Sequence, residues 1–186
     1  MIALQETWLK DIKDQETRLE ERRKLDIPDY QIHVVSCGKG KGIVTYFKNS
    51  TFTHIEDFKD TTFQLSKFKS VICDVINLYR SQNGDFTKLR DQLSTMIDKE
   101  KPTLLIGDFN FCYHSSSAKL LKDFFKSKQF KQLIKEPTHI DGNIIDQAYL
   151  KDCKDALRAK NFINSKYFSD HRGINIMIKQ GDINMN

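Results

Sequence analysis

Short apolar runs, bounded by turn-forming or polar residues, recur along most of this chain. Runs of about four to eight apolar or alternating residues with such boundaries are typical of β-strands. The pattern predicts strands at residues 2–4, 31–35, 43–47, 52–55, 62–65, 71–79, 104–106, 144–150, 161–164 and 173–178. No internal repeat or low-complexity linker divides them, so the strands are expected to share one domain.

Amphipathic helices are predicted between some of these strands. One begins after a candidate N-cap at Asp85, and its apolar face is formed by residues at spacings of three and four: Leu89, Leu93, Met96 and Ile97. A second, at residues 115–128, has lysines on one face and a core-facing stripe on the other: Ala118, Leu121, Phe124 and Phe125. The charged segment at residues 11–24 fits a solvated surface helix or loop. Strands interleaved with amphipathic helices indicate a layered α/β fold.

Three alternating glycines, Gly38, Gly40 and Gly42, follow the strand at residues 31–35 and make a basic turn with Lys39 and Lys41. A phosphate-binding loop is one interpretation of such a segment. The spacing does not match a Walker pattern, and an alternating strand follows directly. A hairpin turn is therefore the favoured prediction.

Composition narrows the class of protein. The 186 residues suit one domain, and 39% hydrophobic with 11% aromatic residues excludes disorder of the whole chain. A formal net charge of +5 is compatible with a polyanionic partner. The four cysteines form no CxxC pair and are interpreted as free thiols of a reducing compartment. Without an apolar run long enough for a membrane or a signal peptide, we expect an intracellular protein with no membrane partner.

The stretch from Leu104 to Asn110 carries the first sign of chemistry. Three aliphatic residues end in Gly107, Asp108, Phe109 and Asn110, so polar groups follow the carboxyl end of a buried strand. On extended backbone Asp108 and Asn110 point the same way, and together they can position a water or a phosphate oxygen. The alternative is a strand that ends in an Asx turn.

Other strand ends and loops supply complementary groups. Glu6 can bind a metal, Tyr79 can donate to a phosphate oxygen, and His171 can stabilise charge or move a proton while Asp146 holds its ring. Each of these residues also has a purely structural interpretation. A loop role is favoured for His139, and the local sequence suggests no acidic partner for the remaining histidines, His33, His54 and His114.

Taken together and in order, these motifs resemble the endonuclease/exonuclease/phosphatase superfamily. The resemblance runs from residue 2 to about residue 178 and is most like the apurinic-type endonuclease domains of non-LTR retrotransposons, which are associated with reverse transcriptase. It rests on these segments: Gln5-Glu6-Thr7, Asn77-Leu78-Tyr79-Arg80, Gly107-Asp108-Phe109-Asn110, Glu136-Pro137-Thr138-His139, Ile145-Asp146-Gln147 and Ser169-Asp170-His171.

This resemblance implies a four-layer α/β sandwich of two packed mixed sheets flanked by helices, with one Mg²⁺ or Mn²⁺ site. It assigns metal binding to Glu6, with Asp170 beside the metal. It also assigns the catalytic roles: Asp108 aligns the attacking water, Asn110 and Tyr79 contact the phosphate, and Asp146 orients His171, which stabilises the transition state.

The sequence also departs from the family pattern. A strand ending in a metal-binding Asn usually precedes the Gln-Glu strand, but only five residues precede Glu6 here. Gln147 replaces the usual His or Tyr, and Ser81 the usual Pro. The domain is therefore expected to span residues 1–179 without the first core strand, followed by a frayed polar tail at residues 180–186. Loss of a central strand would expose a sheet edge.

Three functions are consistent with this pattern. The first is a divalent-metal-dependent phosphodiester hydrolase, a retrotransposon-type DNA endonuclease, which would place the protein in the nucleus. The second is a catalytically inactive relic of the same fold that only binds nucleic acid. The third is a phosphatase acting on lipid or inositol phosphates, for which no amphipathic membrane segment is found.

Overall fold

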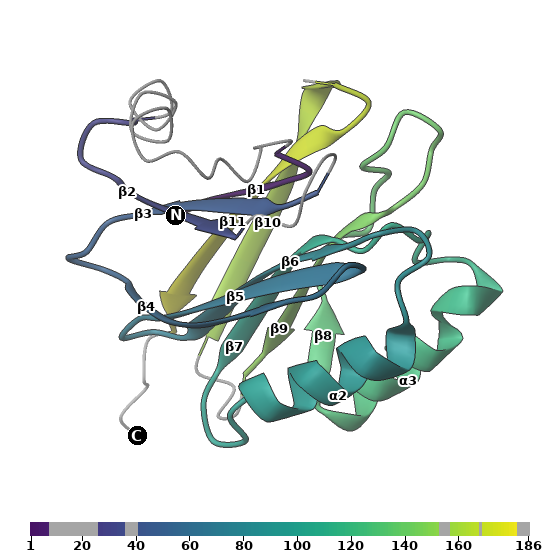
Figure 1. Ribbon diagram of the computed structural model, residues 1–186, viewed down its shortest axis with the longest axis horizontal. Helices are drawn as coiled ribbons and strands as arrows, with labels where there is room; N and C mark the ends of the chain where they lie inside the picture. The colour runs from purple at the N-terminus through teal and green to yellow at the C-terminus, as the bar shows by residue number, and fades with distance from the viewer. Residues whose placement is uncertain (8–25, 36–40, 153–156, 168, 182–186) are drawn as a thin grey trace.

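The computed structural model describes residues 1–7, 26–35, 41–152, 157–167 and 169–181 (Figure 1). The described part is rich in strands. Its strands are β1 (Ile2–Gln5), β2 (Gln31–Val35), β3 (Ile43–Phe47), β4 (Thr53–Lys59), β5 (Phe63–Lys69), β6 (Asp74–Arg80), β7 (Thr103–Asp108), β8 (Phe130–Gln132), β9 (Asp146–Lys151), β10 (Leu157–Tyr167) and β11 (Arg172–Gln180). Its helices are α2 (Phe86–Met96), α3 (Lys119–Ser127) and the short 3₁₀ turn η1 (Ser116–Ala118).

A six-stranded mixed sheet forms the centre, in the order β4-β5-β6-β7-β9-β8. Strands β6 and β7 run parallel, because α2 connects them as a crossover helix, whereas the other neighbours are antiparallel. Helices α2 and α3 both lie against one face of this sheet (Figure 1). Their apolar stripes pack with alternate residues of β5, β6 and β7 into the largest core cluster, which contains Ile76, Leu78, Leu93, Leu105 and Phe125.

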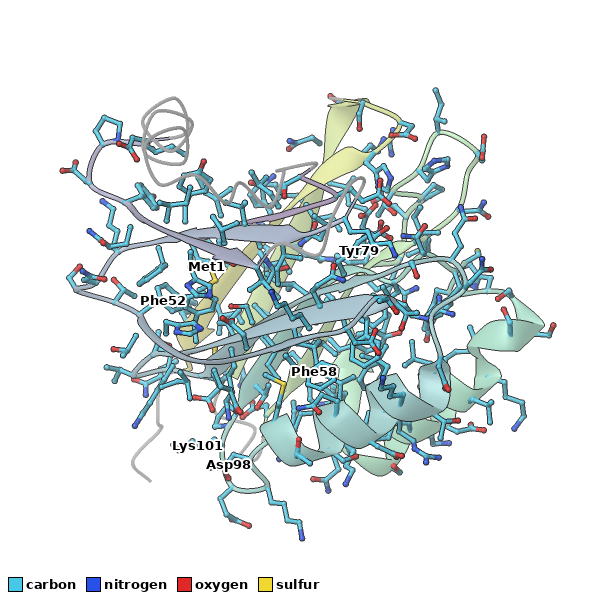
Figure 2. The ribbon with its side chains drawn as sticks, in the orientation of Figure 1. Met1, Phe52, Phe58, Tyr79, Asp98 and Lys101 are labelled. Atoms are coloured by element: carbon cyan, nitrogen blue, oxygen red, sulfur yellow. The ribbon has the colours of Figure 1, made fainter. Side chains whose placement is uncertain are left out.

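The opposite face of the six-stranded sheet is covered by two smaller sheets. One has the order β1-β3-β2 and the other pairs β10 with β11. Strand β6 shows the alternation that a sheet with two covered faces requires. Ile76 and Leu78 pack toward the helices, whereas Val75 and Tyr79 belong to the clusters between the sheets. Figure 2 shows Tyr79 between the six-stranded and the three-stranded sheet, at the opposite end of the six-stranded sheet from Asp98 and Lys101.

The two predicted amphipathic helices are confirmed, including the cap at Asp85, whose side chain accepts hydrogen bonds from the backbone N–H groups of Thr87 and Lys88. The charged segment at residues 11–24, predicted as a surface helix or loop, lies outside the described residues. Neither α2 nor α3 has the length and apolar character needed to cross a bilayer. Cys73 and Cys112 are free thiols, while Cys37 and Cys153 fall outside the described residues.

The strands are confirmed with shifted ends. The strand predicted at residues 71–79 begins only at Asp74, because Ser70 and Cys73 close a turn in which Val71 is 95% exposed. The strand predicted at residues 161–164 is instead the middle of the eleven-residue β10. The three-residue β8 carries no alternating pattern that predicts it and forms only by pairing with β9.

The predicted pair of mixed sheets is right in part. The six-stranded sheet is mixed, but the opposing layer consists of two separate antiparallel sheets. Within the described residues β1 pairs with β3 alone and β11 with β10 alone, so no strand joins the two small sheets. Strand β1 is an outer strand of the three-stranded sheet, and its side chains Ile2 and Leu4 are 39% and 43% exposed.

Candidate active site

The register of the six-stranded sheet brings Tyr79, Asp108 and Asp146 together. Tyr79 lies beside Asp108 in the parallel pair β6–β7, and Asp108 lies opposite Asp146 in the antiparallel pair β7–β9. Side chains at paired positions point to the same face of a sheet. The three side chains therefore form a row across three neighbouring strands.

Gly107 determines how closely Asp108 approaches its neighbours. A Cβ atom at position 107 would lie 1.8 Å from the carbonyl oxygen of Leu78, and the backbone φ there is +152°. Only glycine allows the strands to approach in this way. Phe109, directly after the acid, is fully buried and packs edge-on against Tyr149 and Phe125. Asp108 is thus fixed between a glycine that admits the neighbouring backbone and an aromatic residue anchored in the core.

Asn110 turns back on Asp108. Its backbone N–H donates to Oδ1 of Asp108 at 2.8 Å, and its amide Nδ2 donates to Oδ2 of Asp108 at 3.0 Å and to the carbonyl of Arg80 at 2.9 Å. Its φ of 50° is left-handed, so the expectation that the two side chains project in parallel from extended backbone is wrong. The Asx turn and the polar site are both present. In this geometry the amide holds Asp108 rather than facing outward toward a phosphate.

His171 completes the row from a separate loop. Its Nδ1 lies 2.8 Å from Oδ2 of Asp146, as the sequence predicts. The buried side chain of Thr138 organises both partners: its Oγ1 accepts from the backbone N–H groups of Ile145 and Asp146, and its carbonyl accepts from the N–H of Arg172. The segment around Thr138 therefore connects the start of β9 to the start of β11.

The electrostatics of this group follow from burial and crowding. Burial, and then the negative charges of Asp146 and Glu6, raise the pKa of Asp108 to about 7, although the N–H of Asn110 and the charge of His171 oppose the shift. The hydrogen bond to Asp146 raises the pKa of His171 to about 9 against the opposing effect of burial. At neutral pH the imidazole of His171 is therefore mostly protonated, while the carboxyl group of Asp108 is partly protonated and partly ionised.

Glu6 enters from the facing three-stranded sheet. The hydroxyl of Tyr79 donates to Oε1 of Glu6 at 2.8 Å, and burial followed by this bond raises the pKa of Tyr79. Behind it, Nε2 of Gln5 donates to Oδ1 of Asn77 at 2.6 Å, and Nδ2 of Asn77 donates to Thr45. This buried chain of amides and a hydroxyl fixes the end of β1 over β6 and so aims Glu6 at the row.

Asp170 lies at the rim. Its side chain is 61% exposed, and its oxygens lie 3.5 Å from Nε2 of His139 and 3.9 Å from Nε2 of His171. The backbone of His139 also forms an isolated β-bridge with His171, which brings the loop at His139 next to the site. At this site, two sets of three groups have ligand atoms within 4.8 Å of one another: Asp108 with Asp146 and His171, and His139 with Asp170 and His171. Among the described residues no such set includes Glu6.

The donor chemistry fits a hard divalent cation. Carboxylate oxygens predominate, which suits Mg²⁺ or Mn²⁺. Burial disfavours the ionised form of Asp108, the charges of Asp146 and Glu6 repel it further, and His171 only partly offsets this repulsion. A cation at this edge of the sheet would relieve that repulsion.

Three supporting residues were not assigned roles from the sequence. They are Thr138, Asn77 and Arg80, and all lie within the quoted motifs. Arg80 donates to the carbonyls of Gly84 and Phe109, and its own carbonyl accepts from Asn110. The sequence feature that could have indicated a role for Asn77 and Arg80 is their position beside Tyr79 at the end of the same strand.

Comparison with solved structures identifies the fold. The chain is similar to the endonuclease domain of TRAS1, a telomere-specific non-LTR retrotransposon, with a TM-score of 0.59 and 9% identity over 83% of this chain and 80% of that one. It is similar to the catalytic domain of human Nocturnin, with a TM-score of 0.62 and 13% identity over 95% and 80%. An endonuclease/exonuclease/phosphatase family protein from Leptotrichia buccalis matches with a TM-score of 0.59 and 16% identity over 96% and 86%. The fold is that of the endonuclease/exonuclease/phosphatase superfamily.

A family model narrows this class further. The model described as endonuclease-reverse transcriptase matches residues 73–175, from the start of β6 into β11. The chain belongs to this family. A search among curated proteins found no match. The matched segment contains Tyr79, Asp108, Asp146 and the Asp170-His171 pair, and it ends before the tail.

Proposed function

We propose that this protein is a divalent-metal-dependent phosphodiester hydrolase that nicks DNA, an endonuclease of the retrotransposon type. The observation that carries the proposal is the row formed by Asp108, Asp146 and His171, in which a partly protonated buried acid lies beside a charged imidazole. Phosphodiester hydrolysis needs a group that activates water and a group that stabilises developing negative charge. This row provides both.

Asp108 is the group for the attacking water. Its carboxylate is held by the backbone and the amide of Asn110, so its orientation is fixed before substrate binds. A pKa near neutrality lets it accept a proton from water at working pH. Asn110 acts here as a positioning residue.

His171 is the group that faces the phosphate. Asp146 holds the ring through Nδ1, which leaves Nε2 for a non-bridging oxygen. Because the pKa of His171 is about 9, the ring carries its charge at neutral pH and can stabilise the transition state. Tyr79 already donates its hydroxyl proton to Glu6, so we assign it to orienting Glu6.

Glu6, through the oxygen that Tyr79 leaves free, and the rim residue Asp170 would hold the metal beside the carboxylate of Asp108. A bound Mg²⁺ or Mn²⁺ neutralises phosphate charge and orients the scissile group. DNA as the substrate is supported by membership of the endonuclease-reverse transcriptase family, by the similarity to the TRAS1 endonuclease domain and by the net charge of +5.

The test is nicking of supercoiled plasmid DNA by the purified full chain in Mg²⁺, in Mn²⁺ and in EDTA. We expect metal-dependent conversion to open circles that Asp108→Asn and His171→Gln abolish. Asp123→Asn and His114→Gln are the matched controls, because both residues are exposed on the surface.

Other outcomes separate the remaining functions. Salt-sensitive DNA binding without turnover in either metal would replace this proposal with the binding relic. Release of phosphate from a soluble inositol phosphate, with intact plasmid, would replace it with the phosphatase. Cleavage that survives both substitutions would show that the row is not the catalytic centre.

A further inference from the structure

A second histidine–carboxylate cluster lies outside the candidate active site, where the three-stranded sheet meets the edge of the six-stranded sheet. His33 comes from β2, and His54 and Asp57 come from β4. Nε2 of His33 lies 3.0 Å and 2.9 Å from the two carboxylate oxygens of Asp57, and Nε2 of His54 lies 3.0 Å from Oδ1. We call these three residues the β2–β4 cluster. The local sequence suggests no acidic partner for either histidine, and the fold brings Asp57 to both.

A β-bulge is the reason the cluster forms. Residues three apart on a regular strand point to opposite faces. The register of β4 against β5 shifts between His54 and Glu56, so one extra residue, Ile55, is inserted. The bulge turns His54 to the side of Asp57, and Ile55 is left 47% exposed. Bulges that re-aim a side chain are common next to functional sites.

The cluster is supported from behind. The hydroxyl of Ser66 donates to Oδ1 of Asp57 at 2.8 Å. The two imidazoles stack with centroids 3.9 Å apart, and Phe68 contacts both rings edge-on. A hydrogen bond to the carboxylate ligand and an apolar wall behind the rings are the usual surroundings of a metal site. The three side chains therefore keep their mutual orientation while one side stays open to solvent.

From this geometry we propose that the β2–β4 cluster binds one Zn²⁺ ion that clips the edge strand β4 to β2. Two imidazole nitrogens and one carboxylate oxygen, within 4.8 Å of one another, are the donor set that zinc takes, with water in the fourth position. In a tetrahedral site donor atoms stand about 3.3 Å apart. The nitrogen–oxygen separations of 2.9–3.0 Å need to open by only a few tenths of an ångström, and the two nitrogens lie within 4.8 Å of each other.

The site differs in its donors from the row of the candidate active site. Its nitrogen donors favour zinc over Mg²⁺, whereas carboxylates dominate the set of Asp108, Asp146 and His171. The set of His139, Asp170 and His171 offers the same donor types as the β2–β4 cluster, so the His171→Gln variant separates the two sites. Zinc in the β2–β4 cluster would join β2 to β4, which belong to different sheets and do not pair with each other in the described part of the chain, so bound zinc is expected to stabilise the fold. The alternative is a metal-free hydrogen-bonded triad at the surface.

The experiment is a Zn²⁺ titration of the full chain after EDTA treatment and dialysis, in excess Mg²⁺ to saturate sites made of hard oxygens. Calorimetry gives the stoichiometry, and Co²⁺ in place of zinc gives a tetrahedral ligand-field spectrum. The variants are His33→Gln/His54→Gln and Asp57→Asn, with His114→Gln and His171→Gln as matched histidine controls.

We expect one tight zinc site in the parent chain and in both controls. Affinity falls more than about 100-fold in the double variant, because even indirect partners of a metal are worth about 10–100-fold. At hundredfold excess over Kd, zinc raises the melting temperature of the parent by about 5 °C or more and leaves the double variant unchanged.

Parental zinc affinity in His33→Gln/His54→Gln would overturn the proposal, as would loss of the site in His171→Gln. If the double variant fails to fold by circular dichroism, His54→Gln alone decides, since it changes one side chain on the exposed edge strand. Undiminished zinc and Co²⁺ binding in that single variant would equally overturn the assignment.

Discussion

In the described part of the chain, the set of Asp108, Asp146 and His171 and the β2–β4 cluster both combine histidine with aspartate, but their electrostatics are opposite. Burial and neighbouring negative charges raise the pKa of Asp108 to about 7. Burial also acts to raise the pKa of Asp57, but hydrogen bonds from His33, His54 and Ser66 outweigh it and lower the pKa to about 2. Residue types alone therefore do not make an acid–base site. The count of compensating donors around each carboxylate decides which cluster can transfer protons and which can only bind cations or partners.

The largest expected difference between the clusters is in catalysis. Asp108→Asn and His171→Gln are each expected to lower plasmid nicking by about 10³-fold, because each removes a group that acts on the reacting atoms. Asp57→Asn and His54→Gln are expected to stay within about twofold of the parent. Nicking rates under single-turnover conditions test this difference. Equal losses of rate for variants of both clusters would show that the clusters do not differ in catalysis.

The second difference concerns how each histidine is held. Asp146→Asn removes the charged partner of His171, so its pKa is expected to return from about 9 toward the ordinary value near 6.5. Nicking is expected to fall about 10–100-fold. Titration of the imidazole ¹H signals by NMR measures the shift, with Asp57→Asn as the control that leaves His171 unchanged. A pKa that stays at about 9 in Asp146→Asn would refute the assignment of that partner.

The third difference is the effect of Asp108 on stability. Its folded pKa of about 7 exceeds the unfolded value of 3.8, so it favours folding below pH 3.8 and loses that contribution as pH rises through 7. In the presence of EDTA, Asp108→Asn is therefore expected to gain about 1–2 kcal/mol in free energy of unfolding above pH 7 and nothing near pH 4. Urea unfolding at the two pH values measures the gain. A gain of the same size at both would show that charge is not its cause.

The smallest effect is expected at Asp57, whose ionised carboxylate stabilises the fold, whereas that of Asp108 destabilises it. Its folded pKa of about 2 lies below 3.8, so it stabilises the fold above pH 3.8 and loses this contribution as pH falls through 2. After discounting for solvent at this half-exposed site, Asp57→Asn is expected to lower the metal-free free energy of unfolding by roughly 1 kcal/mol at pH 7. The loss should shrink at pH 3. Thermal melts in EDTA check this, and a deficit that grows toward low pH would contradict it.

The sequence predicted the candidate catalytic residues better than the turn and the hydrogen bonds that hold them in place. Asp108, Asp146 and His171 stand in motifs with recognisable spacing, and the strand ending at Asp108 was visible from its aliphatic run. The left-handed turn at Asn110 was not, because a two-residue spacing suits both an extended strand and an Asx turn. Hydrogen bonding to Arg80, which is distant in sequence, selects the turn.

The β2–β4 cluster shows the limit more sharply. His54 and Asp57 stand three apart, a spacing that assigns them to opposite faces of a regular strand. Only the bulge at Ile55, set by pairing with β5, places them on one face. Likewise β8 exists because β9 offers it an edge. Features that depend on strand pairing rather than on local pattern were therefore beyond prediction from the sequence.

The close approach at Gly107 also affects how related copies of this domain should be interpreted. A side chain there meets the carbonyl of Leu78, so the glycine is required for folding whether or not the domain cleaves DNA. Asp108 has the opposite character, because its buried charge opposes folding. In a lineage released from selection for cleavage, mutational drift should therefore replace the aspartate early and retain the glycine. In a related domain, a retained aspartate at this position therefore indicates selection for activity, whereas a retained glycine indicates only that the domain folds.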